Sequence, residues 1–113
     1  MSKLLKVFVK KFLSLFLVTF SLSSFAEIDA TFANKNVSLT LIVSNTYETR
    51  RKGLMHKKEL EKNSGMIFIW PTSKRQCMWM KNTPLPLSIA FISSTGRILE
   101  IYDMVPFSEE SIC

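Results

Sequence analysis

The alternation of apolar and polar positions predicts two strands in the middle of the chain. Residues 37–44 (VSLTLIVS) alternate and are rich in β-branched side chains, and residues 66–70 (MIFIW) form a short apolar run that stops at Pro71. Both compositions favour strands, and a proline cannot continue a central strand. Residues 76–80 give a weaker strand signal, and residues 27–35 read as a polar lead-in.

A hairpin is predicted near the end of the chain. Residues 87–92 and 97–102 flank the four-residue connection 93–96 (SSTG), whose glycine suits a tight turn. Apolar side chains share one face of each strand: Leu87, Ile89 and Phe91 in the first, and Leu99 and Ile101 in the second. The preceding segment 82–86 (NTPLP) should be an irregular loop, because its prolines cannot join a central ladder.

One short helix is predicted between the first two strands. Asn45 lies three residues before Glu48, which fits a capping box that opens a helix over about residues 46–54. Gly53 should end it, and the three cations before Gly53 oppose the helix dipole. About five strands and one helix indicate a mostly β domain, a small barrel or a sandwich.

The N-terminal residues have the layout of a secretory signal peptide. Residues 1–11 contain four lysines, and an uncharged apolar run follows at 12–20. The small polar segment 21–26 (SLSSFA) then fits signal peptidase cleavage after Ala26. The run is too short for a comfortable membrane span, although an uncleaved anchor is the alternative. We therefore predict a signal peptide at 1–26, a single domain at 27–113, and a periplasmic or secreted bacterial protein.

Charge argues against a nucleic-acid partner once this leader is set aside. The whole chain has a formal net charge of +6, but residues 27–113 hold 11 basic and 9 acidic side chains. A balance of +2 is ordinary for a soluble domain. Membrane contact is expected only through the signal segment before cleavage.

Residues 49–107 resemble the bacterial and archaeal family called domain of unknown function 192. The matching blocks are RKGLM (51–55), Leu60, GMIF (65–68), MWMKNT (78–83), PLSIAFI (86–92), GRI (96–98) and MVP (104–106). The resemblance implies an exported, mostly β domain and carries no established activity. Family members usually have acidic residues where this chain has Ser88 and Ser93, and they continue into further strands, so this chain looks truncated.

The block 79–83 (WMKNT) is the main candidate binding site. Trp79 could provide a stacking platform for a small polar ligand, while Lys81, Asn82 and Thr83 supply polar groups and Arg51 a nearby charge. The alternative is structural: Asn82 and Thr83 satisfy loop backbone groups, and Trp79 fills the core.

Three other patterns suggest chemistry less strongly. His56 is the single histidine, and nothing in the spacing shows that it meets Cys77 as a catalytic partner. Met78 and Met80 share a strand face and could bind Cu(I), but methionine more often fills a small core. The basic segment 50–62 could face anionic lipid or an acidic partner, although interleaved glutamates favour a solvated face.

Cys77 and Cys113 are the two cysteines of the chain. Export would take them to an oxidising compartment where a bridge persists. Because chain ends are often frayed and Cys113 is terminal, two free or intermolecularly paired thiols are the favoured interpretation, with an intramolecular bridge as the alternative.

The functional prediction is a small exported binding or accessory module for an unknown small molecule or protein. No cofactor is expected, and no catalytic set is apparent. One alternative is a hydrolase-like or metal-dependent enzyme that uses Lys81, His56 or Glu100, and another is a fragment without independent activity. Glu100 or Asp103 beside His56 would favour chemistry, whereas a cleft lined by Trp79, Lys81 and Asn82 would favour binding.

Overall fold

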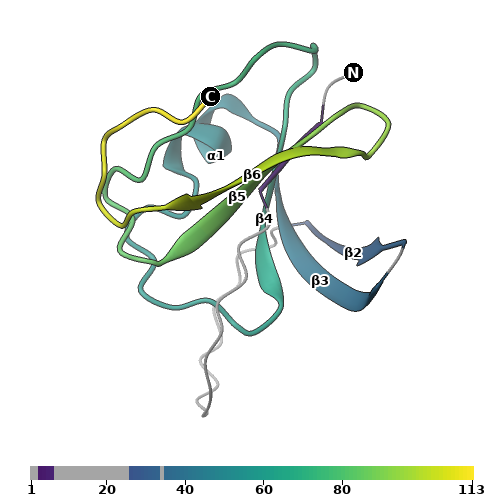
Figure 1. The fold of residues 1–113 in the computed structure, drawn as a ribbon. Helices are drawn as coiled ribbons and strands as arrows, with labels where there is room; N and C mark the ends of the chain where they lie inside the picture. Colours follow the sequence, from purple (N-terminus) through teal and green to yellow (C-terminus); the bar gives the residue numbers. More distant parts are fainter. Residues whose placement is uncertain (1–2, 7–25, 34) are drawn as a thin grey trace.

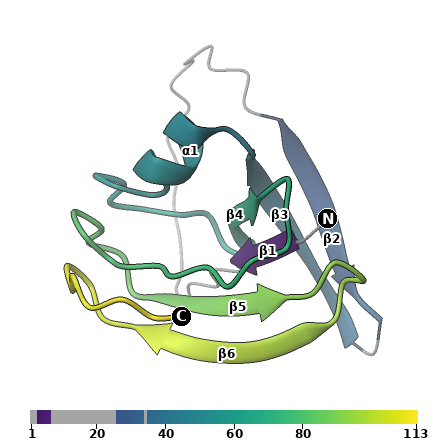
Figure 2. The same ribbon diagram turned by 90° about the horizontal axis from the view of Figure 1, so that it is seen from above.

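The computed structural model describes residues 3–6, 26–33 and 35–113. Two sheets pack against each other (Figures 1 and 2), one with the strand order β1-β4-β3-β2 and the other a hairpin of β5 and β6. The predicted mostly β class is confirmed, and the sheets do not close into a barrel. The greater part of the predicted signal peptide, residues 7–25, lies outside the described residues.

The first sheet is centred on two parallel strands. β3 (Lys35–Ser44) runs parallel to β4 (Ser64–Ile69), and helix α1 lies in the connection between them. β2 (Glu27–Phe32) pairs antiparallel with β3, and β1 (Lys3–Lys6) pairs antiparallel with β4. The segment expected to be a polar lead-in is therefore largely strand β2. Ala30 and Phe32 pack against the buried cluster of the sheet, and this contact holds the strand in place. The local sequence gives little sign of it, because its alternation is weak.

Helix α1 covers Tyr47–Lys52, and its N-cap is Thr46. The Thr46 hydroxyl accepts from the Thr49 N–H at 3.1 Å, and the Thr46 N–H donates to the Thr49 hydroxyl at 3.0 Å. This reciprocal pair satisfies two amides that the first helical turn leaves free. The predicted capping box of Asn45 and Glu48 is thus wrong by one residue, because threonines one position later satisfy the same amides.

Gly53 ends α1 as predicted. Its φ of 49° lies in the left-handed region, where residues with a Cβ are disfavoured. A Cβ on Gly53 would also lie 3.2 Å from the Cζ atom of Phe68, a fully buried ring of β4. Glycine here lets the end of the helix approach the sheet closely.

The second sheet is the predicted hairpin. β5 (Leu87–Ile92) pairs antiparallel with β6 (Ile98–Met104), and a register shift follows Phe91. The inner face of β5 is buried, as the alternation of Leu87, Ile89 and Phe91 predicts. Leu99 and Ile101 of β6 are each 62% exposed, so their shared face points away from the core.

The main core lies between the two sheets. It combines side chains from the end of α1, from β4, from the loop before β5 and from the hairpin: Leu54, Met66, Phe68, Met80, Leu85, Leu87, Ile89, Phe91 and Met104. A smaller cluster of Leu39, Leu41 and Ile67 lies on the other face of the first sheet. Within the described ranges, no helix is long and apolar enough to cross a membrane.

Candidate functional site

The segment 77–83 is held by the C-terminal tail, residues 107–113. A regular strand was predicted at 76–80, but this part of the chain makes one isolated bridge to the tail. Met78 and Ile112 exchange two backbone hydrogen bonds of 2.8 Å each, and the Met80 N–H donates to the Ser108 carbonyl at 2.8 Å. This irregular pairing replaces the strand expected at 76–80, because its partner is a tail without a strand pattern of its own.

A disulfide between Cys77 and Cys113 closes this pairing at its end, across a sequence separation of 36 residues. The interpretation that the thiols stay apart is therefore replaced by the intramolecular bridge. Backbone pairing at Ile112 fixes the chain end, which is why the terminal position of Cys113 does not prevent the bond.

Asn82 gives the segment its tight turn. The Thr83 N–H donates to the Met80 carbonyl at 3.1 Å, and Asn82 occupies the third turn position with a φ of 53°. Asparagine tolerates this left-handed conformation better than most residues. The Asn82 carbonyl also accepts from the His56 N–H at 2.8 Å, which ties the turn to the segment that follows α1.

Thr83 anchors the other side of the turn. It is 5% exposed, its hydroxyl donates to the Lys81 carbonyl at 3.0 Å, and its carbonyl accepts from the Phe107 N–H at 3.0 Å. For Asn82 and Thr83, these backbone contacts agree with the structural alternative. Both residues position the segment that carries Trp79 and Lys81.

Trp79 does not fill the core. Its side chain is 43% exposed, whereas its neighbour Met80 is 1% exposed and belongs to the core. The Lys81 Nζ lies 5.1 Å from the centroid of the indole ring and 3.8 Å from the Glu109 Oε1. The ring is thus a surface platform beside a cation, as the ligand-binding interpretation requires and the core-filling interpretation does not.

A cleft of about 1110 Å³ lies between α1 and the segment 77–83. The five predicted ligand-binding residues all line it: Arg51, Trp79, Lys81, Asn82 and Thr83. Phe68 and Trp70, from β4 and its end, line it as well. The fold therefore brings together residues that are separated by about thirty positions in the chain.

Arg50 is a cleft residue that the sequence analysis placed in the basic segment 50–62 and not in the candidate binding site. Its Nη1 donates to the Ile69 carbonyl at 2.9 Å, and its guanidinium carbon lies 5.6 Å from the centroid of the Trp70 ring. These two contacts hold the charge in place with little conformational freedom. Neither partner is near Arg50 in sequence, so only the tertiary fold reveals the arrangement.

The cleft is electropositive. Its described lining residues include one acidic side chain, Glu48, and four basic ones: Arg50, Arg51, Lys52 and Lys81. Glu109 approaches from the tail and offsets part of the charge of Lys81. Clefts lined by one sign of charge raise the local concentration of oppositely charged ligands.

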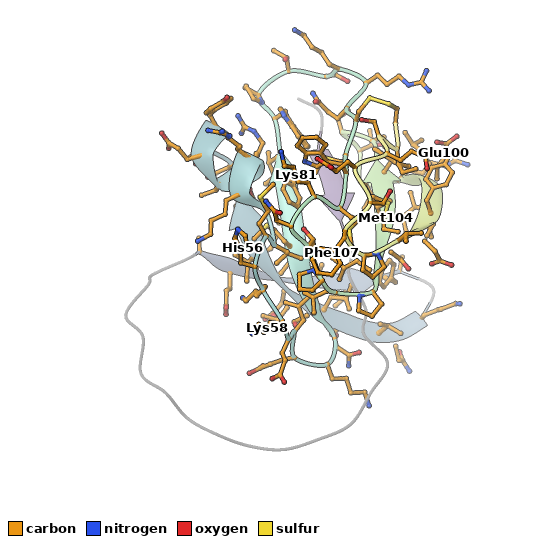
Figure 3. All side chains as sticks on the ribbon, turned by 90° about the vertical axis from the view of Figure 1, so that its left-hand side faces the viewer. His56, Lys58, Lys81, Glu100, Met104 and Phe107 are labelled. Carbon is orange, nitrogen blue, oxygen red and sulfur yellow. A yellow bond between two sulfur atoms is a disulfide. The ribbon has the colours of Figure 1, made fainter. Side chains whose placement is uncertain are left out.

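The acidic residues suggested for catalysis do not lie with His56 and Lys81, which both line the cleft. Cys77 is bonded to Cys113 and is not a free nucleophile. Glu100 accepts from the Tyr102 hydroxyl at 2.9 Å, and Asp103 accepts from the Ser88 hydroxyl at 2.7 Å, so both acids are engaged on β6. Figure 3 shows His56 and Glu100 on opposite sides of the molecule, and neither acid lines the cleft.

The methionine pair faces the core. Met80 is part of the main cluster, and Met78 packs against it, so the two thioethers fill space between the sheets. Within the described ranges, no group of three or more histidine, cysteine, aspartate or glutamate side chains is placed to hold a metal ion.

A comparison with protein families identifies the family of this chain. The model of domain of unknown function 192 (DUF192), described as "Uncharacterized ACR", matches residues 28–113. The chain belongs to this family. No curated protein matches this chain.

Two solved structures are similar to this DUF192 domain. A proposed transcription regulator from Sinorhizobium meliloti 1021 has 33% sequence identity and a TM-score of 0.73, over 81% of this chain and 74% of that one. A protein of unknown function from Novosphingobium aromaticivorans DSM 12444 has 28% identity and a TM-score of 0.70, over 78% of this chain. The match spans 64% of the Novosphingobium chain.

Proposed function

We propose that this DUF192 domain is an exported binding module that holds an anionic ligand in the cleft between α1 and the segment 77–83. The observation that carries the proposal is the convergence of Arg51, Lys81 and the exposed Trp79 ring on one cleft. A cation on an aromatic platform, beside other cations, is suited to an anion that also has an apolar part.

Two further contacts support binding over catalysis. Arg50 is held between the Ile69 carbonyl and the Trp70 ring, so its charge is already oriented before a ligand arrives. Preorganised groups lose less entropy when a ligand binds. The Glu109 carboxylate forms an ion pair with Lys81, which indicates that this ammonium group can bind a carboxylate.

The proposal is tested by titrating the purified chain with two small multivalent anions, citrate and pyrophosphate. Both tryptophans of the chain line the cleft, so intrinsic fluorescence reports on its occupancy. Lys81→Ala should weaken binding by roughly tenfold or more, because hydrogen bonds to charged groups contribute about 1.5–3 kcal/mol.

Lys35→Ala provides a matched control, since Lys35 is exposed on β3 and does not line the cleft. It should bind both anions as the unchanged chain does. Equal weakening by the Lys35 and Lys81 substitutions would show that binding follows net charge alone, and the proposal would then fail.

A further inference from the structure

The backbone of the segment 77–83 is paired along one edge. The tail pairs with the N–H and C=O of Met78 through Ile112, and with the N–H of Met80 through Ser108. In extended chain, the N–H and C=O groups of successive residues point to opposite sides. The N–H and C=O of Trp79 are therefore directed away from the tail, and within the described part of the chain they take part in no backbone hydrogen bond.

Trp79 lines the cleft opposite α1, and the backbone edge of Trp79 that the tail does not pair with is open within the described part of the chain. Figure 1 places the yellow C-terminal tail on the same side of the molecule as α1. The volume of about 1110 Å³ exceeds the usual range of small-molecule pockets, which is roughly 300–1,000 Å³. The cleft is thus large enough for several residues of extended chain.

We infer that the ligand of this cleft is an acidic peptide segment that binds in extended conformation by pairing with the free backbone of Trp79. This inference rests on the proposed function and specifies its ligand class. Addition of a strand to an open edge is a common mode of peptide recognition, in which main-chain hydrogen bonds supply affinity and side-chain contacts supply specificity.

The charges on both walls select an acidic segment. Arg51 and Lys52 are exposed on α1, and Lys81 follows Trp79 on the opposite wall. Side chains of an extended peptide alternate between two faces, so acidic residues at every second position can meet these cations from one side. The chain's own Glu109 already makes such a contact with Lys81.

The probe is an acetylated and amidated hexapeptide of alternating aspartate and valine, titrated against the full chain by tryptophan fluorescence. A hexapeptide of alternating lysine and valine is the charge control and should bind at least about tenfold more weakly. The double variant Arg51→Ala/Lys81→Ala should lose binding of the acidic peptide, and Lys35→Ala should retain it.

Backbone pairing is tested with two N-methylated forms of the acidic peptide, one methylated at the aspartate amides and the other at the valine amides. Because only alternate amides point toward Trp79, one form should lose at least about tenfold in affinity and the other should bind within about twofold of the parent. Equal affinities of the two forms would overturn the inference.

The outcomes separate this inference from the proposed function. If citrate or pyrophosphate binds and the acidic peptide does not, the ligand class is wrong while the anion-binding cleft stands. If neither anions nor peptide bind, both fail. If the lysine–valine peptide binds as tightly as the acidic one, the cleft does not select acidic chains and the inference is overturned.

Discussion

Three residues in left-handed conformation hold the walls of the cleft together. Gly53 has a φ of 49° at the end of α1, His56 has a φ of 62° three residues later, and Asn82 has a φ of 53° in the turn on the opposite wall. The His56 N–H donates to the Asn82 carbonyl and links the two walls. The width of the cleft at this end is therefore set by backbone geometry that few residue types adopt.

Gly53→Ala should lower the free energy of unfolding by about 1–3 kcal/mol, because alanine is strained at this φ and its Cβ meets the buried Phe68 ring. Chemical denaturation measures the change. Gly96→Ala is a matched control: its φ is 87°, but nothing lies within 4 Å of an added Cβ. A larger loss for Gly96→Ala than for Gly53→Ala would contradict the packing part of this explanation.

Trp79→Ala should cost little stability, about 1–2 kcal/mol, because nearly half of the side chain remains in water. A fully packed tryptophan would cost about 3–5 kcal/mol. Met80→Ala, one residue later and 1% exposed, should cost about 2–5 kcal/mol and provides the comparison in the same denaturation experiment. A greater loss for Trp79→Ala would restore the core-filling interpretation.

At the scale of elements, local pattern predicts part of the molecule well. β3, β5 and β6 were predictable from alternating apolar side chains, and β4 from its short apolar run before Pro71, because each of these signals is local and needs no reference to a partner strand. β2 and the pairing of the tail with the segment 77–83 were not, since both depend on contacts between distant segments. Five residues that line the cleft were predicted as a binding site, but neither the shape of the cleft nor the contact of the Arg50 guanidinium with the Trp70 ring could be predicted.

Strand β6 carries a pH-sensitive contact. The Tyr102 hydroxyl donates to the Glu100 carboxylate at 2.9 Å, and this hydrogen bond is the main reason that the pKa of Tyr102 is raised above 10.0. Ionisation of the phenol breaks the bond. The contact therefore contributes to stability below pH 10.0 and loses its contribution as the pH rises through the folded-state pKa.

Glu100→Gln should lower the pKa of Tyr102 toward its ordinary value, because the neighbouring negative charge and the charged acceptor are removed together. Ultraviolet absorbance of tyrosinate follows the titration. Tyr47→Phe in the background leaves Tyr102 as the single tyrosine, since the chain has two. An unchanged midpoint would show that Glu100 is not the cause of the shift.

The tail is an element that has little regular structure and depends on its disulfide. Replacing both cysteines, Cys77→Ser and Cys113→Ser, should lower the free energy of unfolding by about 3–4 kcal/mol, as loop entropy predicts for a separation of 36 residues. Non-reducing mass spectrometry should show the linked peptides in the parent chain. Added reductant should destabilise the parent and leave the double variant unchanged; equal effects on both would refute the bridge.

At the scale of the whole molecule, the N-terminal residues take part in the fold. β1 pairs along β4 and passes beside β5, so it covers an edge of the first sheet next to the second (Figure 2). The expected cleavage point follows Ala26, whose carbonyl accepts from the Val43 N–H at 2.8 Å. Glu27 then begins β2, so in the folded chain the bond to be cut lies at the start of a paired strand.

Because pairing protects this bond, we expect processing to precede folding, and we expect the exported protein to begin at Glu27. N-terminal sequencing of the extracytoplasmic fraction measures this directly. Ala26→Leu places a large side chain at the cleavage position and should retain the leader. Loss of β1 leaves the β4 edge unpaired, so amides of residues 66–69 should exchange with solvent faster in the processed protein than in the Ala26→Leu form. A membrane-bound protein that begins at Met1 would instead identify the leader as an anchor.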